Sequence, residues 1–114
     1  MTLDHFRDFC LNFKGTTEDL PFDENTLVFK VLGKMFALTN LENFEYTNLK
    51  CDAEKAILLR EEYKEVTPAW HMNKKHWNSV SFMGELSDKQ IEQWVTDSYN
   101  LAVRNIPKKL RELL

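Results

Sequence analysis

The chain has 114 residues, the size of one domain, and we expect a single domain over residues 1–114. Hydrophobic residues make up 43% and charged residues 29%, a balance that excludes a disordered chain. The formal net charge of −3 excludes a strongly basic surface that coats nucleic acid, so any such contact must come from a local patch.

The opening MTLDHFRDFC lacks the basic start and apolar run of a secretory signal. No apolar run approaches the roughly 20 residues that a membrane span needs. We therefore expect a cytoplasmic protein with no membrane attachment. Cys10 and Cys51 form no CxxC pair, so we expect reduced thiols.

The first predicted element is an amphipathic helix over Leu3–Phe13, with Thr2 as its N-cap and Gly15 just past its end. The following TTEDLPFDEN combines proline with acids and small polar residues, which predicts a short extended piece or a loop more than a regular element.

The segment Thr26–Thr39, TLVFKVLGKMFALT, predicts a hairpin of two strands that turns at Leu32-Gly33, where glycine can take a positive φ. Its first strand places Leu27, Phe29 and Val31 on one face and Val28 and Lys30 on the other. FEYTNLKC predicts a third strand, so the strands should form an antiparallel meander.

The next predicted element is a helix capped by Asp52. Its apolar stripe is Ala56, Leu59, Tyr63 and Val66. NSVSF then alternates as a half-buried strand does. A capping box at Ser87 starts a long helix that runs to about Asn105, and Pro107 interrupts it or begins a last turn.

The order of helix, strands, helix, strand and helix predicts an α+β fold, an antiparallel β-sheet covered by helices. The regular βαβα alternation that builds a parallel sheet is missing.

Sequence motifs for catalysis or metal binding are scarce. His71 and His76 stand five positions apart, about 140° around a helix, and form no known zinc pattern. Only a folded loop that also brought in His5 could converge them, so we expect no metal site and no cofactor. No nucleophile and base stand at recognisable spacing, and we expect no enzyme activity.

The most distinctive stretch is PAWHMNKKHWNSV, from Pro68 to Val80, where cations and aromatic rings are interleaved. Such a surface can hold phosphates and stack bases. The candidate nucleic-acid-binding residues are Lys74, Lys75, His71, His76 and Trp77, with Lys30, Lys34 and Lys50 as a second group. The competing interpretation makes Trp70 and Trp77 core-edge residues and the lysines a solvated rim.

The chain resembles the MmcQ/YjbR family of small bacterial proteins. The resemblance covers nearly the whole chain and rests on EDLPFDENTLVFKVLGKMFAL, NLKCDAEKAILLREEY and VTPAWHMNKKHWNSV, followed by SYNLAV. Two positions depart from the family pattern: Asp23, where glycine often follows Pro-Phe, and Ala53, where proline often follows Cys-Asp.

The resemblance implies a CyaY/frataxin-like fold with a double-wing arrangement of strands, and it carries the family label of a DNA-binding protein. The frataxin-like side also implies an iron-binding module, but the first helix offers only Asp4 and Asp8 as acids. The family supplies no catalytic residues to transfer.

Our leading hypothesis is a small DNA-associated monomer that contacts the phosphate backbone through a local lysine and aromatic patch. The alternatives are a protein or small-ligand interaction module that uses the same aromatic stretch, and, ranked lower, an iron module.

Overall fold

The chain places one helix before its six strands, one helix among them and two helices after them. The computed structural model describes residues 1–114. Its elements are α1 (Leu3–Leu11), β1 (Thr16–Asp19), β2 (Thr26–Val31), β3 (Lys34–Asn40), β4 (Tyr46–Lys50), α2 (Ala53–Glu62), β5 (Val66–Pro68), β6 (Trp77–Ser81), α3 (Asp88–Arg104) and α4 (Lys108–Arg111). None of these helices is both long and apolar enough to cross a bilayer.

The strands form one six-stranded sheet in the order β1-β2-β3-β4-β6-β5, and every neighbouring pair is antiparallel. The predicted hairpin is confirmed, since β2 and β3 turn at Leu32 and Gly33 with φ values of 47° and 84°. Two positive φ values in a two-residue turn match the twist of paired strands. The α+β prediction with an antiparallel sheet is therefore correct.

The two edge strands were not predicted. TTEDLPFDEN was expected to be a short extended piece or a loop, but its first four residues are a regular strand, β1, which pairs with β2 from Thr16↔Val31 to Asp19↔Val28. The short β5 pairs with β6 at the other edge. The polar sequence of β1 gave no strand pattern, because an edge strand forms through pairing with its neighbour more than through its own alternation of apolar and polar residues.

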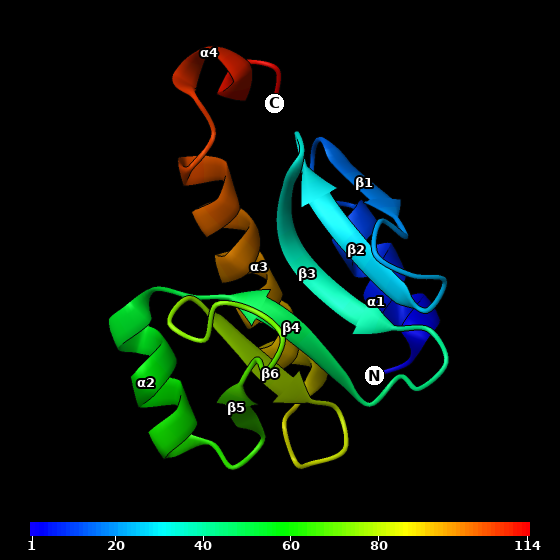
Figure 1. Cartoon of the computed structure of the whole chain (residues 1–114), viewed down its shortest axis with the longest axis vertical. Helices are drawn as coiled ribbons and strands as arrows, with labels where there is room; N and C mark the ends of the chain where they lie inside the picture. Colours follow the sequence, from blue (N-terminus) through cyan, green and yellow to red (C-terminus); the bar gives the residue numbers. More distant parts are fainter.

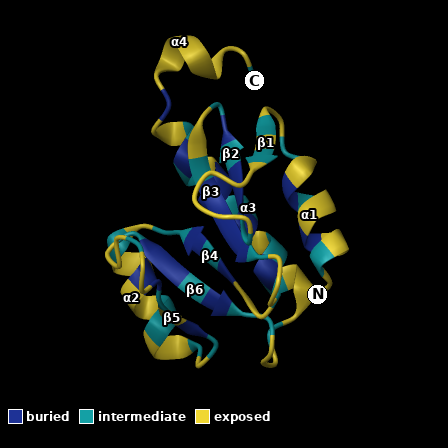
Figure 2. Cartoon of the chain, turned by 45° about the vertical axis from the view of Figure 1, so that its right-hand side comes forward, coloured by how far each residue is buried: buried dark blue, intermediate teal, exposed yellow.

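Helices α1 and α3 cover one face of the sheet, and the strands pass in front of both in Figure 1. This face holds the main core, where the Phe6 ring of α1 meets those of Phe29 and Phe82 at centroid distances of 5.9 and 5.5 Å. Figure 2 shows buried positions along β4 and β6 and exposed ones on the outer sides of α1 and α2. The predicted alternation on β2 is confirmed, because Leu27, Phe29 and Val31 all lie in this core.

The opposite face, which we call the loop face, carries a second, smaller cluster. Val28, Leu38, Ala69 and Trp77 are buried there, with Met35 and Met72 packed against them. The segment between β5 and β6 supplies Ala69 and Met72, so a loop covers this face where a helix covers the other.

Helix α2 is shorter than its apolar stripe predicted. It ends at Glu62, while Tyr63 is extended and Val66 already belongs to β5. The expected Asp52 N-cap position is correct, but the Asp52 side chain makes no hydrogen bond to the helix. Helix α2 packs beside β5 and β6 at the end of the sheet (Figure 1).

The predicted caps of α1 and α3 are confirmed. The Thr2 side chain accepts a hydrogen bond from the amide of His5, and the Ser87 side chain accepts one from the amide of Gln90. Each side-chain oxygen satisfies one amide that the first turn of a helix leaves without a partner.

The two departures from the family pattern are accommodated locally. Oδ1 of Asp23 accepts hydrogen bonds from the amides of Asn25 and Thr26 at 2.8 and 2.7 Å, which closes the turn that leads into β2. These bonds lower the pKa of the Asp23 carboxyl. Ala53 is the first residue of α2, a position that alanine fills without cost.

Candidate functional site

The predicted site stretch forms a compact loop, Ala69–His76, which we call the tryptophan loop. The Met72 amide donates to the Ala69 carbonyl at 3.2 Å, and the His76 amide donates to the Asn73 carbonyl at 3.1 Å. The Asn73 side chain accepts from the amide of Lys75 at 3.0 Å. Hydrogen bonds between its own residues therefore define the conformation of the loop.

The two tryptophans that border this stretch have opposite environments. Trp77 begins β6, is 7% exposed and packs on Val28 and Leu38 in the smaller cluster. The expectation that Trp77 stacks on a ligand is therefore corrected: its ring belongs to the core. Trp70 is 70% exposed and is the tryptophan of this stretch whose ring faces solvent.

Trp70 has a cation beside its ring. Nζ of Lys74 lies 4.2 Å from the ring centroid, within the range of a cation–π contact. Lys75 and His71 are also exposed on this loop, and His76 is half-buried. The tryptophan loop therefore presents an exposed aromatic and cationic cluster, in which Trp70 and not the candidate Trp77 is the exposed ring.

Arg60 of α2 ties the tryptophan loop to the sheet. Its Nε donates to Oδ1 of Asn78 on β6 at 2.7 Å, and its guanidinium also donates to the carbonyl of Lys74. On the loop's other side, the amide of Cys51 donates to the carbonyl of His76 at 2.7 Å. The loop is therefore bonded to Arg60 in the last turn of α2 and to Cys51 just before α2 begins.

The second group of lysines is divided between the two faces. Lys30 pairs in register with Met35, and Lys50 pairs with Trp77, so both lysines point to the loop face. Lys34 pairs with Val31, a residue of the main core, and therefore belongs to the other face. Lys30 lies 3.7 Å from the carboxylate of Asp19, which offsets part of its charge.

The histidines do not converge. Nε2 of His5 lies 2.8 Å from a carboxylate oxygen of Glu92 on α3, far from the tryptophan loop in the chain. Asp4 and Asp8 are exposed on α1. Nowhere do three or more histidine, cysteine or acidic side chains gather in a way that could hold a metal ion.

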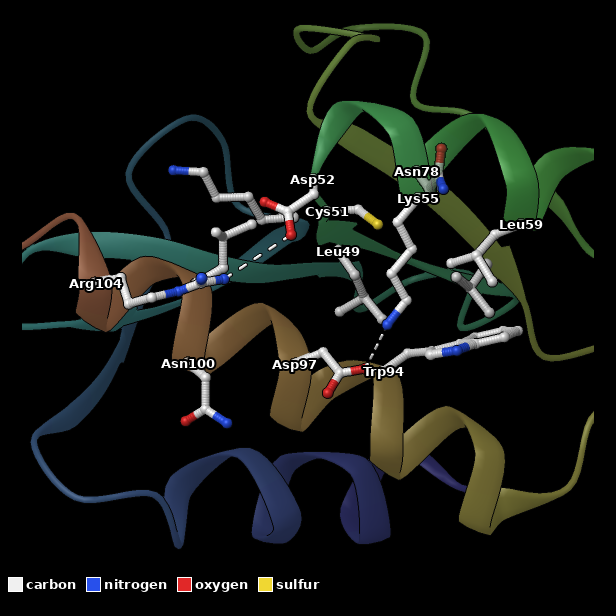
Figure 3. A pocket seen from close by; sticks show the side chains of 13 residues that line it. Leu49, Cys51, Asp52, Lys55, Leu59, Asn78, Trp94, Asp97, Asn100 and Arg104 are labelled. Atoms are coloured by element: carbon white, nitrogen blue, oxygen red, sulfur yellow. Dashed lines mark hydrogen bonds and ion pairs between the residues drawn. The ribbon is translucent and has the colours of Figure 1, made fainter.

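A second feature, which the sequence did not reveal, is a cleft of about 190 Å³ between α2, α3 and the ends of β4 and β6 (Figure 3). Apolar side chains form much of its wall: Leu49, Leu59, Val80, Trp94 and Leu101. The half-buried Cys51 also lines the cleft, and burial raises the pKa of its thiol.

Charged side chains from both helices meet across this cleft. Nζ of Lys55 lies 3.2 Å from Oδ2 of Asp97, and a guanidinium nitrogen of Arg104 lies 3.9 Å from Oδ2 of Asp52. Figure 3 shows both pairs bridging α2 and α3. Such exposed pairs contribute little to stability.

The spacing of the cleft residues along α3 could have predicted one wall of this cleft from the sequence. Trp94, Asp97, Leu101 and Arg104 follow one another by three, four and three positions, which places them on one side of a helix. The stripe mixes apolar and charged residues, a pattern unlike a core face. The partner side chains on α2 could be assigned only once the helices were placed side by side.

Comparisons with known proteins find close relatives. The family model YjbR matches residues 11–101. The Escherichia coli K12 protein YjbR, described as uncharacterized, is 35% identical over 115 aligned positions, which cover 100% of this chain and 98% of the relative. YbdF of Escherichia coli O157:H7, also described as uncharacterized, is 39% identical over 90 positions, 78% of this chain and 74% of that protein.

Solved structures share the fold. A Deinococcus radiodurans protein with a DUF419 domain superposes with a TM-score of 0.91 at 35% identity, covering 98% of this chain and 87% of that one. A Pseudomonas syringae protein gives a TM-score of 0.75 at 28% identity, covering 90% and 99%. These descriptions state no ligand or activity.

Proposed function

Since this chain belongs to the YjbR family, whose relatives above have no stated activity, we propose from its site that it is a nucleic-acid-associated protein that binds DNA on the tryptophan loop. The contacts would be to backbone phosphates and to the π-face of a base, with little sequence selectivity.

The observation that carries the proposal is the exposed Trp70 ring with the Lys74 ammonium over one face, which leaves the other face for a base. Burial of a large aromatic ring is favourable, so a tryptophan that faces solvent on an internally hydrogen-bonded loop is a ready contact surface. A base can stack on the ring while the adjacent ammonium reaches a phosphate, and neither contact depends on base identity.

Further cations support the same surface. Lys75 and His71 lie on the tryptophan loop, and Lys30 and Lys50 point to the loop face beneath it. Lys34 and Trp77 are not part of the proposed contact set, because Lys34 lies on the other face and Trp77 is buried. With a net charge of −3 the protein attracts DNA only locally, so binding should be weak and sensitive to salt.

An unpaired base stacks on Trp70 without first leaving a duplex, so we expect single strands to bind more tightly than duplexes. The test is fluorescence anisotropy of labelled single- and double-stranded DNA across a salt series. Contact with about four phosphates gives a log–log salt slope near −2.8 for a single strand.

Three variants make this experiment specific. Lys74→Ala/Lys75→Ala should weaken binding and flatten the salt slope by about 1.4 for a single strand, because two phosphate contacts are lost. Trp70→Ala should weaken binding to single strands more than to duplexes, and Trp70→Phe should restore part of it. The matched control, Lys108→Ala/Lys109→Ala, makes the same charge change at exposed positions on α4.

A folded parent protein that shows no salt-sensitive binding to either DNA form would overturn the proposal. Equal losses in the loop variant and the α4 control would do the same, because they would indicate a response to net charge alone. The rival candidate, a protein interaction module that uses Trp70 as an anchor, predicts partners that survive nuclease treatment.

The proposal includes the remaining expectations from the sequence: a monomer in the cytoplasm with a CyaY/frataxin-like, double-wing arrangement. Two helices, α1 and α3, cover one face of the antiparallel sheet and leave the loop face to a single loop, which supports the comparison with that fold. Sedimentation across a concentration series would test the monomer.

A further inference from the structure

We propose that the cleft between α2 and α3 binds a small amphipathic carboxylate, with its apolar body between the helices and its carboxylate at Arg104. This inference uses residues outside the tryptophan loop and stands independently of the DNA proposal.

The size of the cleft limits the ligand. Its volume of about 190 Å³ is below the roughly 300–1,000 Å³ of sites for drug-sized molecules. An apolar cavity of about 150 Å³ is enough for a benzene ring. A single ring or a short alkyl chain therefore fits.

The wall of the cleft determines the chemistry of the ligand body. Leu49, Leu59 and Trp94 present apolar surface toward the space between the helices (Figure 3). The Trp94 ring is held edge-on by Tyr63 at a centroid distance of 5.0 Å, so it offers a fixed surface for packing. An apolar group that enters this space leaves water, which favours binding.

The charges at the opening favour an anionic head. The cations whose side chains meet in the cleft are Lys55 and Arg104, and the acids are Asp52 and Asp97; Lys50 borders the cleft at the end of β4, but its side chain points to the loop face. Asp97 is satisfied twice, by Lys55 at 3.2 Å and by the side-chain amide of Gln93 at 2.9 Å. Arg104 has only the 3.9 Å contact with Asp52 as an ion pair. Of the two cations inside the cleft, Arg104 is therefore the more available partner, and its planar donors match a carboxylate.

The start of α2 adds to this preference. The Asp52 side chain makes no capping bond, so the first-turn amides of α2 lack a side-chain acceptor where Asp52 and Lys55 line the cleft. A carboxylate at this place would replace Asp52 as the partner of Arg104 and could accept hydrogen bonds from the first-turn amides of α2.

The experiment is an amide chemical-shift titration of ¹⁵N-labelled protein with three probes of matched shape: benzoate, benzamide and benzylamine. Benzoate should give saturable shifts at the cleft residues Cys51, Lys55 and Asp97. Benzamide should bind about ten-fold more weakly and benzylamine more weakly still, because neither offers an anion to Arg104.

Two variants keep the test decisive. Arg104→Gln should weaken benzoate about five-fold and leave benzamide unchanged, while the control Lys109→Gln alters neither. Leu101→Trp should fill the cleft and abolish binding of all probes in a protein whose remaining spectrum is unchanged. If that variant fails to fold, protection of the Cys51 thiol from iodoacetamide by benzoate provides the second measurement.

Absence of saturable shifts at the cleft, equal affinity for benzoate and benzylamine, or an unchanged benzoate affinity in Arg104→Gln would each overturn the proposal. The variant Lys74→Ala/Lys75→Ala should bind benzoate as the parent does. Failure of DNA binding and failure of carboxylate binding can therefore be told apart.

Discussion

Nε of Arg60 on α2 donates a 2.7 Å hydrogen bond to Oδ1 of Asn78 on β6, a side chain that is only 2% exposed. The Asn78 amide in turn donates to the carbonyl of Ala56 at 3.2 Å. The same guanidinium also reaches the carbonyl of Lys74. One arginine thus connects the helix, the central sheet and the tryptophan loop.

Arg60→Ala should destabilise the protein by about 1–3 kcal/mol, because it leaves the buried Asn78 oxygen without a donor. It should also raise amide hydrogen exchange in the tryptophan loop, since the Lys74 carbonyl loses its anchor. Denaturant unfolding and hydrogen exchange measure the two effects. The control Arg111→Ala, on exposed α4, should change neither; unaltered loop exchange in Arg60→Ala would contradict the anchoring role.

Ser98 should be equally sensitive, because its buried hydroxyl joins α3 to two strands. It donates to the Phe36 carbonyl at 2.5 Å and accepts from the Lys50 amide at 2.8 Å. We expect Ser98→Ala to cost about 1–3 kcal/mol in urea unfolding. Ser79→Ala, at a half-buried position with no side-chain hydrogen bond, serves as the control and should stay within about 0.5 kcal/mol. Equal effects would show that the hydroxyl bonds carry no net stability.

The ion pair between Arg7 of α1 and Glu18 of β1 should make stability depend on acid pH. Nε of Arg7 donates to both Glu18 oxygens, at 2.8 and 2.9 Å, and these bonds lower the pKa of Glu18 from its ordinary 4.5. A lowered folded-state pKa gives stability that is present above pH 4.5 and lost as the pH falls through the folded value.

The parent should therefore exceed Glu18→Gln in unfolding midpoint at neutral pH, and the difference should shrink on acidification below 4.5. Urea unfolding at several pH values measures it. Glu24→Gln is the control, a loop carboxylate with no ion pair. A difference that stays constant across this range would exclude the proposed linkage.

The two cysteines should react at different rates. Cys10 is fully buried, and burial raises the pKa of its thiol strongly, so native protein should resist alkylation there. Half-buried Cys51 should react with iodoacetamide, more slowly than a free thiol because its pKa is also raised. Peptide mass spectrometry distinguishes the sites, and denatured protein should be labelled at both. Native labelling of Cys10 ahead of Cys51 would contradict this packing.

The sequence by itself determined the features that depend on neighbouring residues. The caps at Thr2 and Ser87 and the turn at Leu32-Gly33 were predicted correctly, because a cap or a tight turn is decided within a few positions of the chain. The two faces of β2 were also predictable, since side chains alternate along any strand.

Only the tertiary structure decided the features that need a distant partner. Strands β1 and β5 exist because β2 and β6 offer free edges, and their own sequences carry little strand pattern. Trp70 and Trp77 have the same side chain in the same stretch, yet Trp77 alone falls on the loop-face core, because β6 begins there. The cleft depends on where α2 and α3 meet, and the pairing of Arg104 with Asp52 joins residues far apart in the chain. Local preference acts over a few residues, whereas burial and ion pairing depend on which surfaces the folded chain brings together.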